Sequence, residues 1–187
     1  MMRCAALLLA LSISAGQGAM AQGLNDLGAF FALHSENATW LKPDRGPANW
    51  QVEVSGVIVT KRVALDGRET YSAVDMSGVP SPLCPAYWLS IAARYAQSCA
   101  VPWSNEESAA QSAAHADLMG FIAANAYPPR PASEIEAAFV RRATAALDFE
   151  GDRCAAMAVF DAVYPAQIKH ARAAMALPRL VVEAQCP

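Results

Sequence analysis

The sequence lacks the short motifs that mark common catalytic sites. It contains no G-x-S-x-G, no H-E-x-x-H and no glycine-rich phosphate loop. It also has no C-x-x-C pair, which argues against a thioredoxin-like redox centre and against a zinc ribbon. Motifs alone therefore predict no chemistry for this chain.

Positive charge is also scarce. The 187 residues contain 14 Lys and Arg against 17 Asp and Glu, for a net charge of −3, and no basic run stands out. The electrostatic surface that nucleic acid or anionic lipid requires is missing, so we expect no nucleic-acid partner. Arg outnumbers Lys and Ala is abundant, a composition common in bacteria with GC-rich genomes.

Long apolar runs are missing except near the N-terminus. Residues 4–13 are apolar and follow Arg3, and Ala19-Met20-Ala21 is a small-x-small cleavage pattern. The run is shorter than the ~20 residues that span a bilayer. These features predict a signal peptide over 1–21, cleavage before Gln22, and a periplasmic or secreted protein with no membrane span after cleavage.

The remaining pattern predicts a single α+β domain over 22–187, with 22–49 as an N-terminal arm that ends in a turn-rich loop. Apolar alternation and the dipeptide Asp66-Gly67 predict an antiparallel hairpin over about 50–76, with a bulge at Gly56. Alternation near the C-terminus predicts a further strand of this small sheet over about 180–186.

The position of the hairpin turn also predicts a strand register. A two-residue turn at Asp66-Gly67 places Val59 opposite Val74 and Val57 opposite Met76. These four apolar side chains would then share the buried face of the sheet.

We expect four or five helices from 84–176 to cover that face. A helix begins near Pro85, since proline suits a first helical turn. Capping boxes at Ser104–Glu107 and Ser133–Glu136 predict two further helices that pair as an αα-hairpin. Asp152 is the expected cap of a shorter helix.

The cysteines predict two disulfides. Cys84, Cys99, Cys154 and Cys186 follow the signal peptide and allow three pairings. A helix between Cys84 and Cys99 would hold them about 22 Å apart, whereas bridged Cα atoms lie within about 7 Å. The αα-hairpin returns the chain from Cys99 to Cys154, so these two should bond, and Cys84 then pairs with Cys186 by elimination.

Few side chains are candidates for chemistry or for binding. His115 and Asp117 point to different faces of a helix because they are two residues apart, and Glu106 and Glu107 suit a helix N-terminus. No metal-ligand spacing surrounds any histidine, so we predict no cofactor and no metal, and the sequence identifies no catalytic residue. Three tryptophans at the ends of elements either cover the edge of the core or anchor a partner: Trp40, Trp50 and Trp103.

We therefore expect a non-enzymatic binding or accessory protein of the bacterial envelope, with another envelope protein as its partner. Two alternatives remain open. One is a protein that binds a small molecule or a metal, and the other is a hydrolase of envelope material that uses His115, Asp117, Glu106 or Glu107. A deep pocket with converging polar groups would favour the alternatives, and a flat apolar patch with exposed tryptophans would favour the first hypothesis.

Overall fold

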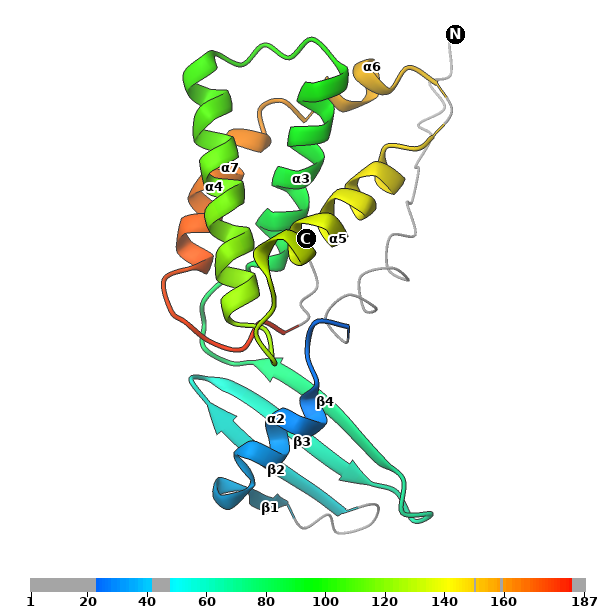
Figure 1. Ribbon diagram of the computed structural model, residues 1–187, viewed down its shortest axis with the longest axis vertical. Helices are drawn as coiled ribbons and strands as arrows, with labels where there is room; N and C mark the ends of the chain where they lie inside the picture. The colour runs from blue at the N-terminus through cyan, green and yellow to red at the C-terminus, as the bar shows by residue number, and fades with distance from the viewer. Residues whose placement is uncertain (1–22, 42–47, 150, 159, 183–187) are drawn as a thin grey trace, which may run out of the picture.

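The computed structural model describes residues 23–41, 48–149, 151–158 and 160–182. A four-stranded antiparallel sheet with a short helix forms one end of the molecule, and a group of longer helices forms the other (Figure 1). The predicted α+β class is thereby confirmed. Within these ranges, no helix combines the length and apolarity that crossing a membrane requires.

The sheet is a meander in which each strand pairs with the next. The strands are β1 (Thr39–Leu41), β2 (Ala48–Val54), β3 (Val57–Val63) and β4 (Glu69–Asp75), in the spatial order β1-β2-β3-β4. The predicted hairpin corresponds to the last three of these strands. The 3-10 helix η2 (Ser35–Asn37) and β1 lie in the segment expected to be a loop.

The first tight turn joins β2 to β3 through Ser55 and Gly56. Both residues have positive φ, 51° and 77°, which is the conformation of a type I′ hairpin turn. Val54 and Val57 face each other across it. The bulge expected at Gly56 is therefore wrong, because this glycine occupies the second position of a two-residue turn.

The second turn is one residue longer than predicted. The Ala64 N–H donates to the Arg68 carbonyl at 2.9 Å, and the Gly67 N–H donates to the Ala64 carbonyl at 2.9 Å. Gly67, with φ at 80°, closes this three-residue loop in the left-handed region. The Asp66 carboxylate accepts from the Arg68 N–H at 3.0 Å, which favours the longer loop.

This longer loop shifts the register by one residue. Val59 faces Ala73 and Val57 faces Asp75, so the predicted pairs with Val74 and Met76 are wrong. Side chains alternate between faces along a strand, and a shift of one residue reverses the face of β4. Val74 and Met76 are accordingly 54% and 65% exposed.

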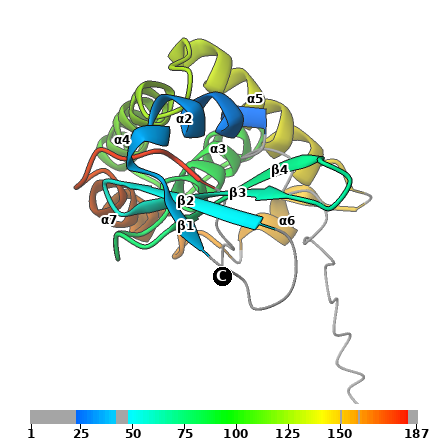
Figure 2. The ribbon, with the colours of Figure 1, turned by 90° about the horizontal axis from the view of Figure 1, so that it is seen from below.

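Helix α2 (Leu27–Leu33) covers the buried face of the sheet (Figure 2). Phe30 and Phe31 of this helix pack with Val52, Val57 and Val59, all of them buried. The longer helices pack mainly on one another rather than on the sheet. The expectation that four or five helices cover the sheet is therefore wrong, since the main helical contacts with the described strands come from α2, with η2 against β2.

The helices of the other end are α3 (Leu83–Ser98), α4 (Asn105–Ala124), α5 (Ala132–Ala146), the short α6 (Arg153–Ala158) and α7 (Tyr164–Ala174). The capping box of α4 is confirmed, because Ser104 and Glu107 exchange both hydrogen bonds, at 2.7 and 3.1 Å. Asp152 caps α6 through the Ala155 N–H at 3.0 Å. The second predicted box is wrong, since α5 begins two residues earlier, after Pro131, whose carbonyl accepts the first helical hydrogen bonds.

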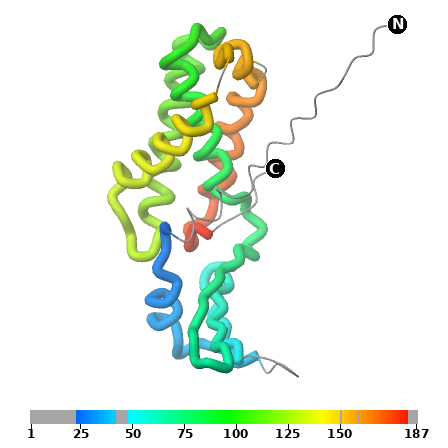
Figure 3. Tube along the Cα trace, turned by 90° about the vertical axis from the view of Figure 1, so that its right-hand side faces the viewer, coloured from blue at the N-terminus to red at the C-terminus, as the bar shows by residue number. Residues whose placement is uncertain are grey.

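The chain after α7 passes between the helices and the sheet (Figure 3). Val181 is buried; its N–H donates to the Asn125 carbonyl at 3.0 Å and its carbonyl accepts from Asn25 Nδ2 at 2.6 Å. These partners replace a sheet neighbour, so the predicted C-terminal strand is wrong for 180–182. Residues 183–186 of that strand lie outside the described residues.

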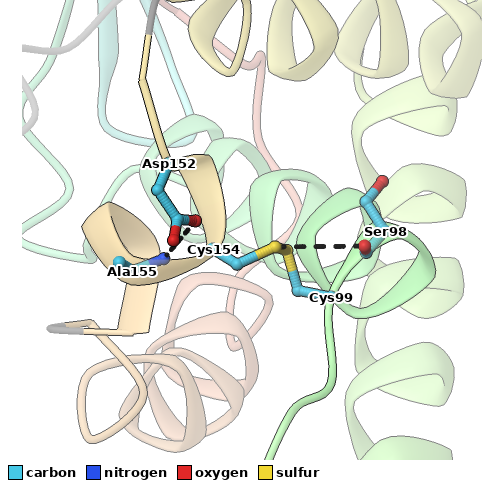
Figure 4. The surroundings of a disulfide bond; sticks show 5 residues. All are labelled: Ser98, Cys99, Asp152, Cys154 and Ala155. Atoms are coloured by element: carbon cyan, nitrogen blue, oxygen red, sulfur yellow. Dashed lines mark hydrogen bonds between the residues drawn. A yellow bond between two sulfur atoms is a disulfide. The ribbon is translucent and has the colours of Figure 1, made fainter.

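One of the two predicted disulfides is confirmed. Cys99, at the end of α3, bonds to Cys154 of α6, with their Cα atoms 5.6 Å apart (Figure 4). The αα-hairpin of α4 and α5 lies between them in sequence, as the pairing argument required. Cys186 lies outside the described residues, and its bond to Cys84 stays a prediction.

Candidate functional site

A groove of about 530 Å³ opens between α3, α4, α5 and the connector that follows α3. This volume falls within the range of small-molecule sites. Its apolar lining consists of Leu89, Ala93, Ala96, Val101, Ala116 and Val140. Its polar and aromatic lining consists of Ser90, Arg94, Gln97, Trp103, Ser108, Gln111, Ser112, His115 and Glu136.

Helix α4 supplies the polar wall through its own periodicity. Ser108, Gln111, Ser112 and His115 are spaced three, four and seven residues along the chain, so they share one face of the helix. Further along the same face, Leu118 lies seven residues after Gln111 and packs into the core. The part of this face between residues 108 and 115 therefore forms a polar wall of the groove.

The best-defined polar contact in the groove joins α3 to α4. Ser90 Oγ lies 2.8 Å from His115 Nε2 and 2.8 Å from the Ala86 carbonyl oxygen. The carbonyl can only accept, so it takes the hydroxyl proton, and His115 donates its Nε2–H to Ser90 Oγ. Ser90 is only 1% exposed. This serine thus points its proton away from the histidine and offers almost no surface to a substrate.

Burial also sets the charge of His115. It lowers the pKa of His115 below its usual value, while the nearby carboxylate of Glu136 acts in the opposite direction. The imidazole is therefore neutral at neutral pH. With Nε2 donating to Ser90, Nδ1 is left as an acceptor.

Gln111 is a groove residue whose side-chain amide is not fully hydrogen-bonded. The residue is 7% exposed, and its Nε2 has no hydrogen-bond partner among the described residues. An unpartnered buried polar group costs about 1–3 kcal/mol, so such groups are rare unless a ligand or water completes them. Gln111 therefore leaves an N–H donor in the groove wall that a bound molecule can use.

The three tryptophans predicted as interaction residues lie in two places. Trp103 lines the groove, packs on Tyr95 and Tyr164 with ring centroids 6.0 and 5.5 Å away, and has a buried Nε1 without a partner. Trp40 faces Trp50 across β1 and β2 and is 56% exposed. The tryptophans of the sheet and the tryptophan of the groove therefore do not form one patch.

The candidates for catalysis are not brought together. Glu106, Glu107 and Asp117 are exposed and line no part of the groove, so His115 has none of them as a groove neighbour. In the described part of the chain, no group of three or more His, Cys, Asp or Glu side chains could hold a metal ion. His34 packs on Phe30 with ring centroids 4.6 Å apart, and His170 is exposed on α7.

Sequence reasoning missed the residues that accompany His115 in the groove. Ser90 lies on the apolar side of α3 and resembles a core position, while Arg94 and Glu136 resemble exposed helix residues. The polar row on α4 was the available signal, since it recurs at helical spacing around His115. The chain matches no family model, and no similar protein is found among curated proteins or solved structures.

Proposed function

We propose that this protein is a non-catalytic binding protein that holds a small molecule in the groove between α3, α4 and α5. The buried amide of Gln111 carries the proposal, because it lacks a partner although it lines a cavity of about 530 Å³. Buried polar groups nearly always have a partner, so the missing one is supplied by a bound molecule.

The surroundings of Ser90 support binding over hydrolysis. A nucleophilic serine gives its proton to a base and reaches the substrate. Ser90 gives its proton to the Ala86 carbonyl and is 1% exposed. The acidic candidates Glu106, Glu107 and Asp117 lie outside the groove, so they supply no base for Ser90.

The N-terminal pattern and the disulfide support an envelope location for this binding. The Ala19-Met20-Ala21 pattern favours export, and the Cys99–Cys154 bond is of a kind that persists in oxidising compartments. The ligand is then a molecule of the periplasm. Intact mass of the protein purified from its own compartment should correspond to a chain that begins at Gln22; a species that retains residues 7–9 contradicts this part of the proposal.

A neutral fluorescent probe tests the groove without assuming the ligand. N-phenyl-1-naphthylamine brightens in apolar surroundings, and we expect the wild-type protein to bind it. Ala116→Trp places a large ring in the groove and should abolish this binding. Ala113→Trp, also on an exposed position of α4 but outside the groove, should leave it unchanged. Equal binding by both variants would show that the probe lies elsewhere and would contradict the proposal.

Gln111→Leu provides a second test, on stability. Without ligand, replacing an unpartnered buried amide by an apolar group should leave the free energy of unfolding unchanged or increase it. The same change at Gln167 of α7, also buried but outside the groove, is the matched control. A Gln111→Leu variant that is less stable than Gln167→Leu would show that the amide has a structural role instead.

A further inference from the structure

The Ser90–His115 contact fixes how α3 and α4 align along the groove. The two helices run in opposite directions (Figure 1), and these residues meet at 2.8 Å. Four residues are about one helical turn, so Arg94 on α3 and Gln111 on α4 lie about one turn from this contact, at a common level. The groove therefore has an Arg94–Gln111 level toward the connector and a Ser90–His115 level further from it.

The Arg94–Gln111 level carries N–H donors that its neighbours leave unused. Arg94 donates to Gln97 Oε1 at 2.7 Å, and no acidic side chain in the described ranges forms an ion pair with it. In the part of the chain that the structure describes, Gln111 Nε2 has no acceptor. A guanidinium has five N–H donors, so most of those on Arg94 remain available to a ligand.

The Ser90–His115 level instead carries a carboxylate and an acceptor nitrogen. Glu136 lines the groove there and is close enough to His115 to oppose the effect of burial on its pKa. The neutral imidazole offers an acceptor nitrogen. A second negative charge on the ligand would therefore be repelled at this level, while Leu89, Ala93 and Val140 provide apolar contact between the polar residues.

We infer that the groove selects a molecule with one carboxylate and an apolar body, and that Arg94 and Gln111 bind the carboxylate. This inference rests on the proposed binding function and adds the ligand class. One carboxylate oxygen accepts from the guanidinium and the other accepts from the Gln111 amide, which gives the buried amide the partner that it lacks. Charge-assisted hydrogen bonds of this kind are about twice as strong as neutral ones, so they discriminate well.

Three matched probes test the ligand class by calorimetry: 4-phenylbutyrate, 4-phenylbutanamide and 4-phenylbutylamine. They share one apolar body and differ in the charge of the head group. The anion should bind at least about tenfold more tightly than the amine, with the amide between them. An amine that binds as tightly as the anion overturns the inference.

Variants locate the head group. Arg94→Gln should weaken 4-phenylbutyrate about tenfold or more and change 4-phenylbutanamide less than about threefold. Arg141→Gln removes the same charge from an exposed position outside the groove and should change neither. Glu136→Gln should strengthen binding of the anion about two- to threefold, since it removes a nearby like charge.

The neutral fluorescent probe separates failure of this inference from failure of the function. If wild type binds N-phenyl-1-naphthylamine and Ala116→Trp does not, the groove binds small molecules. Loss of charge preference under those conditions, or an equal effect of Arg94→Gln on all three head groups, overturns the carboxylate inference alone. If wild type does not bind the neutral probe and binds none of the three head groups, the proposed function fails and the inference falls with it.

Discussion

Arg179 Nε donates to Asp75 Oδ2 at 2.6 Å, which joins residues 104 positions apart in the chain. The guanidinium is 1% exposed. Its remaining N–H groups donate to four backbone carbonyls, those of Val79, Pro80, Ala174 and Leu177, at 2.8 to 3.2 Å. All five donors are thereby used, and one side chain links the end of β4, the connector before α3 and the segment after α7.

Asp75→Ala should destabilise the protein strongly. It leaves the buried guanidinium of Arg179 without a counter-charge, and breaking a buried pair in this way costs about 3–5 kcal/mol. Urea unfolding followed by circular dichroism measures the change. Glu69→Ala, which breaks the exposed pair with Lys61, is the control and should have little effect. Equal losses of stability in the two variants would show that the Arg179–Asp75 pair does not stabilise the junction between the sheet and the helices.

Stability should fall in two steps as the pH is lowered. Burial lowers the pKa of His115 below 6.5, with Glu136 opposing it, so the unfolded chain binds this proton more readily and stability declines as pH falls below about 6.5. Burial by itself would raise the pKa of Asp75, but hydrogen bonds from Ser77 and Arg179 outweigh it and hold that pKa below 3.8. The ionised Asp75 carboxylate therefore contributes its full stabilisation above about pH 3.8, and this contribution is lost as the pH falls further and the carboxylate is protonated.

The variant His115→Gln assigns the first step. A glutamine does not titrate, so the slope of unfolding free energy against pH between 5 and 6.5 should become smaller, while the decline below about pH 3.8 remains. His170→Gln, on an exposed helix face, should leave both steps as they are. An unchanged slope in His115→Gln would contradict the assignment.

Two glycines with similar backbone angles should differ in their tolerance of alanine. Gly56 and Gly67 have φ of 77° and 80°, so a side chain is strained at either site. A Cβ at Gly56 would also lie 2.8 Å from the Cα of Ser77, whereas nothing lies within 4 Å at Gly67. Gly67→Ala should therefore cost about 1–2 kcal/mol and Gly56→Ala clearly more. Equal losses in thermal unfolding would show that the contact with Ser77 is relieved by movement of the backbone.

Several features that depend on local chemistry were predictable from the sequence, although the capping box expected at Ser133 was not formed. The capping box at Ser104 and the cap at Asp152 are both present, because each is decided by side chains within four residues. The Cys99–Cys154 bond followed from the geometry of two capped helices and a turn. The register of β3 and β4 was not predictable in the same way. The dipeptide Asp66-Gly67 lies in a loop of three residues rather than two, and in this loop the Arg68 N–H donates to the Asp66 carboxylate.

The groove depends on how three helices pack, and that is not visible along one of them. Ser90 belongs to an apolar helix, and its role appears only when α4 places His115 against it. Arg94 and Gln111 are 17 residues apart and line the same groove because α3 and α4 pack side by side. The predicted C-terminal strand is wrong at 180–182 for a related reason. Val181 lies in a segment with the alternation of a strand, but its backbone groups bond to Asn25 and Asn125 instead of to the sheet.

The disulfide should contribute to both stability and binding. The Cys99–Cys154 bond closes a separation of 55 residues, which corresponds to about 4 kcal/mol in the chain-entropy estimate, so the double variant Cys99→Ser, Cys154→Ser should lose a large part of this.

The bond also fixes the start of the connector that carries Trp103 into the groove, because Cys99 and Cys154 pack in the same cluster as this tryptophan. We therefore expect the double variant to bind the neutral fluorescent probe more weakly at a temperature where it is still folded. Peptide mapping without reductant should recover a Cys99–Cys154 peptide. A Cys84–Cys99 peptide would contradict the structure, because the helical rise along α3 would hold those cysteines about 22 Å apart.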